Sequence, residues 1–251
     1  MKALCFTLKG KTAFFKKPEV NSYYYFTYGN IHKVALLGIF GAILGYGGYT
    51  QQYRNQEKKR ELQKGYPEFY EKLCKLNVSI CPNAEKGFIA KKIQTFNNSV
   101  GYASKEPGGN LIVKEQWLEN PSWDIVVLLD CEEAEQLAES ITLHKCVYSP
   151  YLGKNDHFAD IINVQVVEAM EMETGSGILS CLFQKENAGI LESKGMKGNN
   201  PMSFKYQESL PVSLDVWTNN YQLQQFVYTD AKVSWEHQKV YVIEEKYKMF
   251  F

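Results

Sequence analysis

The run WDIVVLL, from Trp123 to Leu129, constrains the fold more than any other segment. A continuous apolar run this short is typical of a strand that is buried on both faces. The segment Glu132 to Leu143 follows at once and predicts a helix, because its apolar residues recur at helical spacing. These residues are Ala134, Leu137, Ala138 and Ile141. We therefore expect a central strand followed by an amphipathic helix.

The same order of patterns is found upstream. Lys2 to Lys9 alternates in a way that predicts a strand lined with apolar groups on one face. Asn30 is the expected N-cap of a helix from Ile31 to about Gly45, where glycines 45, 47 and 48 end it. A polar helix from about Gln52 to Lys64, closed by a Tyr-Pro pair, and a strand from Leu73 to Ile80 complete this part.

Two extended runs, Phe88 to Asn97 and Asn110 to Trp117, flank a turn-rich linker with Pro107, Gly108 and Gly109. They predict a long inserted β-hairpin. With a fourth strand expected near Cys146 to Tyr151, the order is that of a ferredoxin-like or RNA-recognition-motif domain. From Ala159 onward the pattern is β-rich, without a helix or a repeat.

The predicted class is therefore α+β, with two parts. Residues 1–152 form a ferredoxin-like (RRM-like) domain with an inserted thumb hairpin at about 86–118. Residues 153–251 form a smaller β-rich C-terminal domain. A chain of 251 residues, 45% of them hydrophobic, is long and apolar enough to bury such a core.

Charge is balanced over the whole chain, with 28 basic and 28 acidic residues, but it is unevenly distributed. Residues 1–33 contain six lysines and one acid, whereas residues 119–139 contain seven acids and no base. This polarity indicates one surface for phosphates and another for solvent or protein. Ordinary variation in surface charge is the alternative.

The remaining composition argues against other classes. The six cysteines lie too far apart for a zinc or redox motif, so we expect reduced core thiols in a cytosolic protein. The apolar run Val34 to Leu44 is about half of the roughly 20 residues that span a bilayer. It also begins too far along the chain for a secretory signal, and we expect no membrane insertion.

Gly38, Gly41 and Gly45 share one face of the first predicted helix. An internal glycine costs about 1 kcal/mol relative to alanine, so a close approach must compensate. The neighbour is either another backbone, a nucleic acid or the sheet beneath the helix. His32 and Lys33 are expected as cations in the first turn, where a bound phosphate would offset their repulsion with the helix dipole.

Lysines and aromatic residues alternate before that helix. Lysines can follow a phosphate backbone while exposed rings stack on unpaired bases, although part of these rings must face the core. The set comprises Lys11, Phe14, Phe15, Lys16, Lys17, Tyr23, Tyr24, Tyr25 and Tyr28. The predicted hairpin adds five lysines, at 86, 91, 92, 105 and 114, against Glu106 and Glu115. It is either an arm that reaches across RNA or an edge protected from aggregation.

Signals for catalysis are weaker. The four histidines have no metal-ligand spacing, and no nucleotide-binding loop or nucleophile elbow is present. A metal-free ribonuclease would need a base and a cation, which Tyr46 with His32 or a hairpin lysine can supply in principle.

Three segments together resemble the family-five CRISPR-associated proteins of the RAMP superfamily. They are KGKTAFFKKPEVNSYYYFTYG, HKVALLGIFGAILGYGGY and YSPYLGKNDHFADI. Gly38, Gly41 and Gly45 are similar to that family's G-x-x-G-x-x-x-G pattern. Tyr151-Leu152-Gly153-Lys154 is similar to its leucine-glycine motif after the second helix. The nearest resemblance is to the version in type I, subtype B (Cascade) complexes.

The resemblance implies a non-catalytic subunit that caps the 5′ handle of the CRISPR RNA. Its partners would be the backbone subunit and the large subunit, with target DNA reached indirectly through the complex. It implies a cytoplasmic protein without a cofactor, metal or membrane. The predicted RNA-binding residues are Lys11, Phe14, Lys16, Lys17, Tyr25, His32, Lys33, Gly38, Gly41, Gly45, Tyr46, Lys91, Lys92, Lys114 and Lys154.

A related branch, in subtype C complexes, cuts repeat RNA with a Tyr, Lys and His site. Tyr46 follows the glycine helix here, but the predicted hairpin contains no histidine. Binding is therefore preferred over a metal-independent endoribonuclease. A protein-interaction module without a nucleic-acid role is the third hypothesis.

Overall fold

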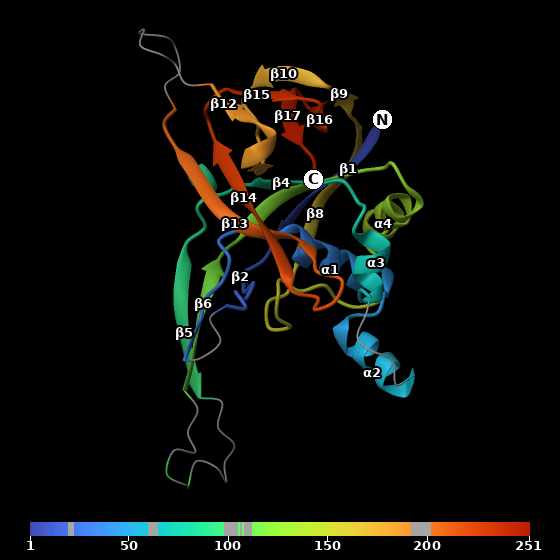
Figure 1. Cartoon of the computed structure of the whole chain (residues 1–251), viewed down its shortest axis with the longest axis vertical. Helices are drawn as coiled ribbons and strands as arrows, with labels where there is room; N and C mark the ends of the chain where they lie inside the picture. The colour runs from blue at the N-terminus through green and yellow to red at the C-terminus, as the bar shows by residue number, and fades with distance from the viewer. Residues whose placement is uncertain (20–22, 60–64, 98–104, 106, 108–111, 192–201) are drawn as a thin grey trace.

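The main sheet has four strands that run antiparallel to their neighbours in the order β4-β7-β1-β8 (Figure 1). The computed structural model describes residues 1–19, 23–59, 65–97, 105, 107, 112–191 and 202–251. Within them the chain is a mixed α and β structure, rich in strands that form several sheets. The strands of the main sheet are β1 (Lys2–Lys9), β4 (Val78–Pro82), β7 (Ser122–Leu128) and β8 (Asp160–Glu168).

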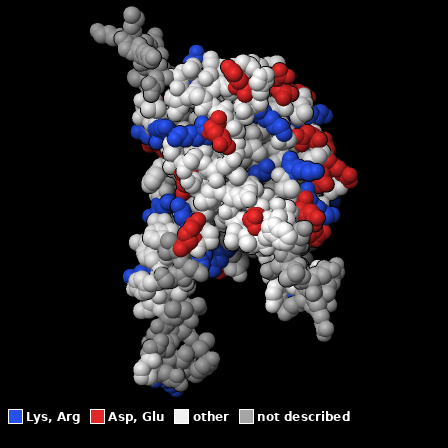
Figure 2. All heavy atoms as spheres, viewed as in Figure 1, with Lys and Arg blue, Asp and Glu red and all other residues white. Residues whose placement is uncertain are grey.

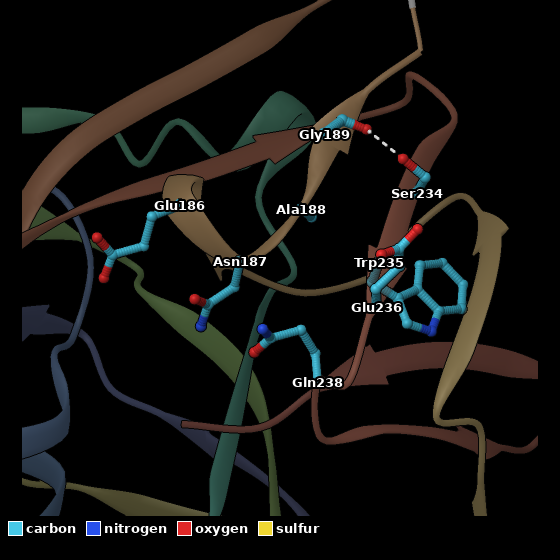
Figure 3. Close-up of a pocket in the computed structure, with 8 residues that line it drawn as sticks. All are labelled: Glu186, Asn187, Ala188, Gly189, Ser234, Trp235, Glu236 and Gln238. Atoms are coloured by element: carbon cyan, nitrogen blue, oxygen red, sulfur yellow. Dashed lines mark hydrogen bonds between the residues drawn. The ribbon is translucent and has the colours of Figure 1, made fainter.

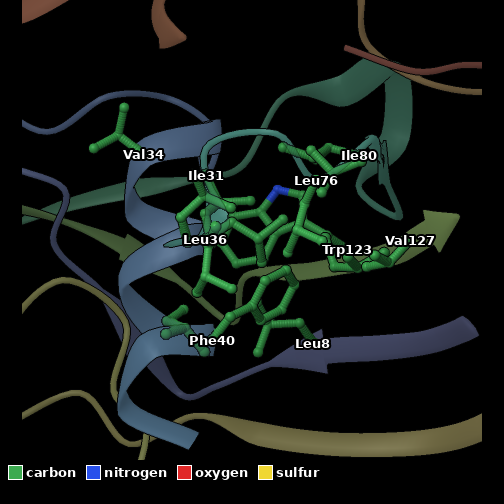
Figure 4. Packing of buried hydrophobic residues seen from close by; sticks show 14 of the residues in the cluster. Leu8, Ile31, Val34, Leu36, Phe40, Leu76, Ile80, Trp123 and Val127 are labelled. Carbon is green, nitrogen blue, oxygen red and sulfur yellow. The ribbon is translucent and has the colours of Figure 1, made fainter. Parts of the chain in front are cut away.

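Helices cover one face of this sheet. The strand side chains that point toward them, such as Leu8 and Trp123, pack against Leu36 and Phe40 (Figure 4). Each such buried side chain contributes about 1.5–3 kcal/mol through removal of apolar surface from water. The helices are α1 (Lys33–Leu44), α3 (Glu68–Leu73) and α4 (Glu132–Thr142). The core predicted from WDIVVLL and from the spacing in 132–143 is confirmed.

C-terminal strands cover the opposite face. Alternation along β1 turns Ala3 and Cys5 away from the helices, into a cluster with Tyr241 and Phe250. On this face they form the sheets β17-β16-β9 and β10-β15-β12. The third small sheet, β11-β14-β13, packs on the helical side, where Leu210, Leu214 and Phe226 join the core with α1. The bounds of these strands are β9 (Met170–Glu171), β10 (Thr174–Gly177), β11 (Phe183–Gln184), β12 (Gly189–Ile190), β13 (Lys205–Leu214), β14 (Tyr221–Thr229), β15 (Val233–Glu236), β16 (Val240–Ile243) and β17 (Lys246–Met249). In the described residues after Ala159, the one helical turn is the 3₁₀ segment η3 (Lys185–Asn187).

A hairpin projects from the body of the molecule, as expected. Its strands β5 (Lys91–Asn97) and β6 (Ile112–Glu119) pair antiparallel and extend beyond the main sheet (Figure 1). Two short strands join β6 at the base of the hairpin, β2 (Thr12–Ala13) and β3 (Tyr24–Tyr25). The 3₁₀ turn η1 (Glu85–Gly87) precedes β5. Gly108, Gly109 and Asn110 lie outside the described residues.

Two expectations about element positions near α1 and α3 are wrong. The N-cap of α1 is His32, whose Nδ1 accepts from the Ala35 amide, and Asn30 is instead a buried bridge. The side-chain Oδ1 of Asn30 accepts from the Trp123 indole at 2.9 Å, and its Nδ2 donates to the Gly87 carbonyl at 3.1 Å. The predicted strand from Leu73 begins only at β4, because helix α3 occupies residues 68–73.

The fourth strand of the sheet is also placed differently. Residues 146–151 form no strand beyond a single bridge from Tyr151 to Phe158. The partner of β1 is β8, starting at Asp160. The polar helix is α2 (Tyr49–Lys59), three residues earlier than expected, and residues 60–64 lie outside the described part.

No single described helix is long and apolar enough to cross a membrane. Helix α1 and the first part of α2 reach the required length and hydropathy only together, across a bend of 74°. The expectation for the cysteines holds in part: all six are free, and Cys5, Cys81 and Cys181 are buried. Cys74 and Cys131 are half-buried, and Cys146 is exposed.

Candidate nucleic-acid interface

The hairpin presents two faces with different side chains, because residues alternate along a strand and cross-strand partners share a face. We call them the Lys92 face and the Lys91 face. The register places Lys92, Gln94, Phe96, Val113, Glu115 and Trp117 on the first, with Tyr25 of β3. It places Lys91, Ile93, Thr95, Lys114, Gln116 and Leu118 on the second, with Tyr24.

Lysine ammonium groups lie beside aromatic rings on the Lys92 face. Lys16 Nζ is 4.3 Å from the centroid of Tyr25, and Lys92 Nζ is 6.0 Å from that of Trp117. Lys154 reaches the same face from the 151–158 loop and lies 5.1 Å from the Phe96 centroid. Such contacts place a cation near the electron-rich face of a ring.

A buried polar cluster fixes the 151–158 loop to the hairpin. Glu115 is 6% exposed and accepts from the Trp117 indole at 2.8 Å and from Lys154 Nζ at 3.3 Å. His157 shares a 2.6 Å hydrogen bond between Nδ1 and the Thr12 hydroxyl, and its ring contacts Trp117 edge-on. Burial, ahead of any nearby charge, lowers the pKa of His157. The imidazole is therefore a neutral connector between the loop and the strands.

The Lys91 face continues toward the C-terminal strands. Lys114 Nζ is 5.0 Å from the Tyr23 centroid. Burial lowers the pKa of Lys91, with Lys17 acting in the same direction and Glu208 opposing. Lys17 forms an ion pair of 3.4 Å with Glu208, which also accepts from the Gly29 amide at 2.9 and 3.0 Å. Strand β13 thereby holds the basic turn 11–18 against the hairpin base.

The structure brings one part of the predicted site residues together at the hairpin base. These are Lys16, Lys17, Tyr25, Lys91, Lys92, Lys114 and Lys154. Lys11 is exposed next to β2, and its carbonyl accepts from the Asn120 amide. Phe14 is buried beneath the same region, where its amide donates to the Leu152 carbonyl. Its ring is therefore part of the core and no stacking surface.

His32 is no surface cation, contrary to the expectation. It is 2% exposed, and burial lowers the pKa of its imidazole to about 3. The rings of Phe15, Tyr28 and Tyr221 surround it. A neutral imidazole that accepts a hydrogen bond caps a helix without the repulsion expected of a cation at that end.

The glycine stripe faces protein. A Cβ at Gly41 would lie 2.5 Å from Phe69 Cβ of α3, and one at Gly38 would lie 4.0 Å from the Phe69 ring. Gly45 is the left-handed C-cap of α1, with φ of 81°, and abuts Val147. The neighbour that approaches the glycines inside α1 is thus helix α3. It is neither a nucleic acid nor the main sheet.

Two other predicted residues lie away from the hairpin. Lys33, in the first turn of α1, is partly buried, and desolvation lowers its pKa to about 8. Tyr46, beyond the end of α1, has its hydroxyl 3.4 Å from Gln136 of α4 and its ring 4.7 Å from Lys72 Nζ. These contacts place Tyr46 beside α3 and α4.

Several residues of the interface escaped the sequence analysis. They are Phe96, Trp117, His157 and Phe158, which contact the predicted lysines or lie in the same loop. Glu115 was counted only as a charge of the hairpin, and Tyr23 only as a member of the aromatic set. Alternation along 112–119 is a signal that could have grouped Glu115 with Trp117. No spacing rule links residue 157 to residue 12, because the loop joins them only in three dimensions.

Charge on the surface is divided between two sides. Figure 2 shows lysine atoms near the base of the hairpin and many acids on the side where α4 lies, with further lysines among those acids and on the upper part of the molecule. The first turn of α4 carries Glu132, Glu133 and Glu135. The polarity expected from sequence is therefore found only in part, since carboxylates also pair with Lys17, Lys92 and Lys154.

One surface hollow, of about 260 Å³, lies elsewhere. It is lined by Glu186, Asn187, Trp235, Glu236, Gln238 and nearby backbone (Figure 3). Two carboxylates and no lysine make it unsuited to phosphate. Among the described residues, no three His, Cys, Asp or Glu side chains are grouped as metal ligands would be.

Solved structures provide the comparison that bears on the fold. A chain titled "CRISPR RNA-guided surveillance complex" aligns with a TM-score of 0.53 and 14% identity, over 91% of this chain and 90% of the other. A CRISPR protein from Archaeoglobus fulgidus aligns with a TM-score of 0.50 and 11% identity, over 99% of both chains. The fold is that of CRISPR proteins. The sequence itself matches no protein-family profile and no curated protein.

At these identities the similarity establishes the CRISPR-protein fold alone. It agrees with the resemblance drawn from the three sequence segments. The interface at the hairpin base is therefore part of a CRISPR-type fold, and it combines cations, exposed rings and a rigid loop.

Proposed function

We propose that this chain is a non-catalytic RNA-binding subunit of a type I CRISPR interference complex. In this proposal it caps the 5′ handle of the guide RNA, in the manner of family-five proteins of subtype B. The observation that carries it is the gathering of Lys16, Lys92 and Lys154 beside aromatic rings on the Lys92 face of a projecting hairpin, with Lys114 beside Tyr23 on the other face. Cations with stacking rings suit a single strand of nucleic acid.

The ferredoxin-like, RNA-recognition-motif assignment belongs to the same proposal. The order β4-β7-β1-β8, with α1 after β1 and α4 after β7, supports it. In this reading, the β5–β6 hairpin is the thumb, inserted along the chain between strands β4 and β7 of the main sheet. The division into parts at residue 152 remains a prediction.

The ion pairs at the interface are compatible with phosphate binding. The pairs Lys92–Glu119 (3.7 Å) and Lys154–Asp156 (3.5 Å) are partly exposed. Exposed pairs of this kind contribute only about 0–1 kcal/mol. A phosphate can therefore replace the carboxylate at small cost, and each lysine can keep its contact with a ring.

Docking to a backbone subunit and a large subunit is the second half of the proposal. Support comes from the acidic side of the molecule. The carboxylates of α4 lie opposite the hairpin base and leave that side unsuited to RNA. We place the protein in the cytoplasm, with target DNA reached only through the assembled complex.

Purification of the full chain with its complex, followed by sequencing of the bound RNA, tests the proposal. We expect RNA with repeat-derived 5′ ends. For the isolated chain, the variant Lys16→Ala/Lys92→Ala/Lys114→Ala should lower the slope of log K against log salt by about 2, since each phosphate contact on a single strand contributes about 0.7. The control Lys246→Ala removes an exposed lysine of the C-terminal strand β17. Recovery of unrelated RNA, or equal slopes, contradicts the proposal.

Binding without cleavage is also proposed, and the burial of His32 supports it, since a capped and buried imidazole is a poor general base. Incubation of the protein with repeat RNA in a chelator is the test. We expect no product. Product formation that is lost on Tyr46→Phe would instead favour a metal-independent endoribonuclease.

A further inference from the structure

Residues 150–159 form a small turn that displays two aromatic rings. We propose that Tyr151 and Phe158 are a stacking platform for unpaired bases of the bound nucleic acid. This inference rests on the proposed function and names a base-binding site within it. It differs from the lysine contacts, because rings recognise bases and lysines recognise phosphates.

The turn is closed by its own backbone. Leu152 N donates to the His157 carbonyl at 2.7 Å, His157 N donates to the Lys154 carbonyl at 3.0 Å, and Ala159 N donates to the Pro150 carbonyl at 3.2 Å. Tyr151 and Phe158 form an antiparallel bridge between these bonds. The platform is therefore built on a fixed backbone, which reduces the entropy lost on binding.

The inner side chains of the turn are anchored in the molecule. Leu152 is fully buried, and His157 is hydrogen-bonded to Thr12 and packed against Trp117. Gly153 has φ of 89°, and a Cβ there would lie 2.0 Å from the Phe14 carbonyl oxygen. Only glycine permits this approach, so the turn is held tightly against the strand β2 region.

Alternation then directs the neighbouring side chains outward. Because Leu152 and His157 point inward, their neighbours Tyr151 and Phe158 point to solvent, on one face of the bridge. Phe158 is 71% exposed and Tyr151 is 44% exposed. Two exposed rings on a rigid turn bury little apolar surface when the chain folds. A ligand that covers them would bury this surface on binding and so gain affinity.

The surroundings favour a nucleic acid over a purely apolar partner. A Cβ at Gly10 would lie 2.7 Å from the Phe158 carbonyl oxygen, so Gly10 lies against the backbone of Phe158. Lys9 and Lys11, the neighbours of Gly10 in the chain, are therefore close to that backbone. Lys154 lies within the same turn. Asp156 pairs with Lys154, and Asp160 is opposite Lys9 in the β1–β8 register. These acids oppose a phosphate directly above the turn, but they leave an uncharged base free to stack.

The experiment combines ring removal with base removal. The full chain is titrated with an unpaired RNA oligonucleotide that carries the repeat-derived 5′ end, and with a series in which one base at a time is abasic. Phe158→Ala should weaken binding of the intact RNA by about 5-fold or more, within the range of one lost stack. Its effect should disappear on the RNA that lacks the stacked base. Phe158→Trp should retain the affinity, and Tyr151→Ala should act on the adjacent base.

The control is Tyr53→Ala, which removes a ring that is 54% exposed on α2. It should leave the affinity unchanged. Equal binding by wild type and Phe158→Ala overturns the inference while the proposed function stands. An equal loss on intact and abasic RNA, or a loss confined to binding of a protein subunit, also overturns it. If wild type binds no RNA at all, the proposed function fails first, and the platform fails with it.

Discussion

The cap of α1 predicts a specific loss of stability in mild acid. His32 accepts the Ala35 amide through Nδ1 and is enclosed by Phe15, Tyr28 and Tyr221. Protonation would replace the acceptor with a donor and place a charge in an apolar site at the positive end of the helix. The burial that lowers the pKa of His32 to about 3 is thus also a preference of the folded state for the neutral ring.

The magnitude follows from linkage between folding and protonation. The pKa of an unfolded histidine is about 6.5, so as pH falls the unfolded chain takes up the proton first. The contribution is fully present above about pH 6.5 and decreases toward pH 3 by about 1.4 kcal/mol per pH unit. Between pH 7 and pH 5 the free energy of unfolding should fall by about 2 kcal/mol from this residue alone.

Urea unfolding at pH 7, 6 and 5, monitored by circular dichroism, measures this loss. The variant His32→Asn keeps an N-cap acceptor and removes the titrating group. Its loss from pH 7 to pH 5 should be smaller than that of wild type by about 2 kcal/mol. His157 also has a lowered pKa and contributes to both proteins equally. Lys33, next along the chain, has a pKa of about 8 and stays charged throughout. Identical pH slopes for the two proteins would refute the reasoning.

Four further substitutions probe packing and charge. Gly41→Ala should lower the free energy of unfolding by about 1–3 kcal/mol, because its Cβ would overlap Phe69. Gly38→Ala has room for its Cβ and should raise the free energy of unfolding by up to about 1 kcal/mol, with both variants measured by urea unfolding. Glu119→Gln should raise RNA affinity at low salt, because it releases Lys92 from its ion pair. It should change the free energy of unfolding by less than about 0.5 kcal/mol. Unchanged RNA affinity would contradict a phosphate-binding role for Lys92. Glu208→Gln should destabilise the protein by about 2 kcal/mol in urea titrations, because a half-buried carboxylate loses charge-assisted hydrogen bonds. Unchanged stability would exclude Glu208 as a connector.

Local pattern was sufficient for the elements whose burial is uniform. Strand β7 is covered on both faces, and its apolar run has no other explanation in so short a segment. Helix α4 has one buried stripe and a solvated face, so its spacing predicts both the helix and the side that packs. Strand β1 starts and ends at Lys2 and Lys9, as its alternation predicts.

The misplaced elements depend on contacts between distant residues. Asn30 has the chemistry of an N-cap, but Trp123 and Gly87 bind its amide, and the cap passes to His32. Helix α3 has only six residues and forms where Phe69 meets the glycines of α1. Such contacts between elements override local propensity, and no window of sequence contains them.

The site was predicted where its residues are close in sequence or paired by strand register. The basic turn was recognised from lysines that alternate with aromatic residues, and the hairpin from two extended runs that carry lysines. Lys154 came from the motif resemblance, and its pairing with Glu115 emerged only from the fold. The residues that fix the interface, Glu115 and His157, are buried polar groups, and a count of surface charge cannot find them.

Charge counting also overstates the free positive charge at the hairpin base. Lys17, Lys92 and Lys154 each have a carboxylate within 4 Å, so the potential there is weaker than the number of lysines indicates. Selectivity for a nucleotide chain must then come from geometry as much as from charge. A phosphate can displace an exposed carboxylate such as Glu119, but it cannot displace buried Glu115, which keeps Lys154 and the 151–158 loop in place. The paired acids therefore separate into competitors, whose removal should strengthen binding, and supports, whose removal should weaken it.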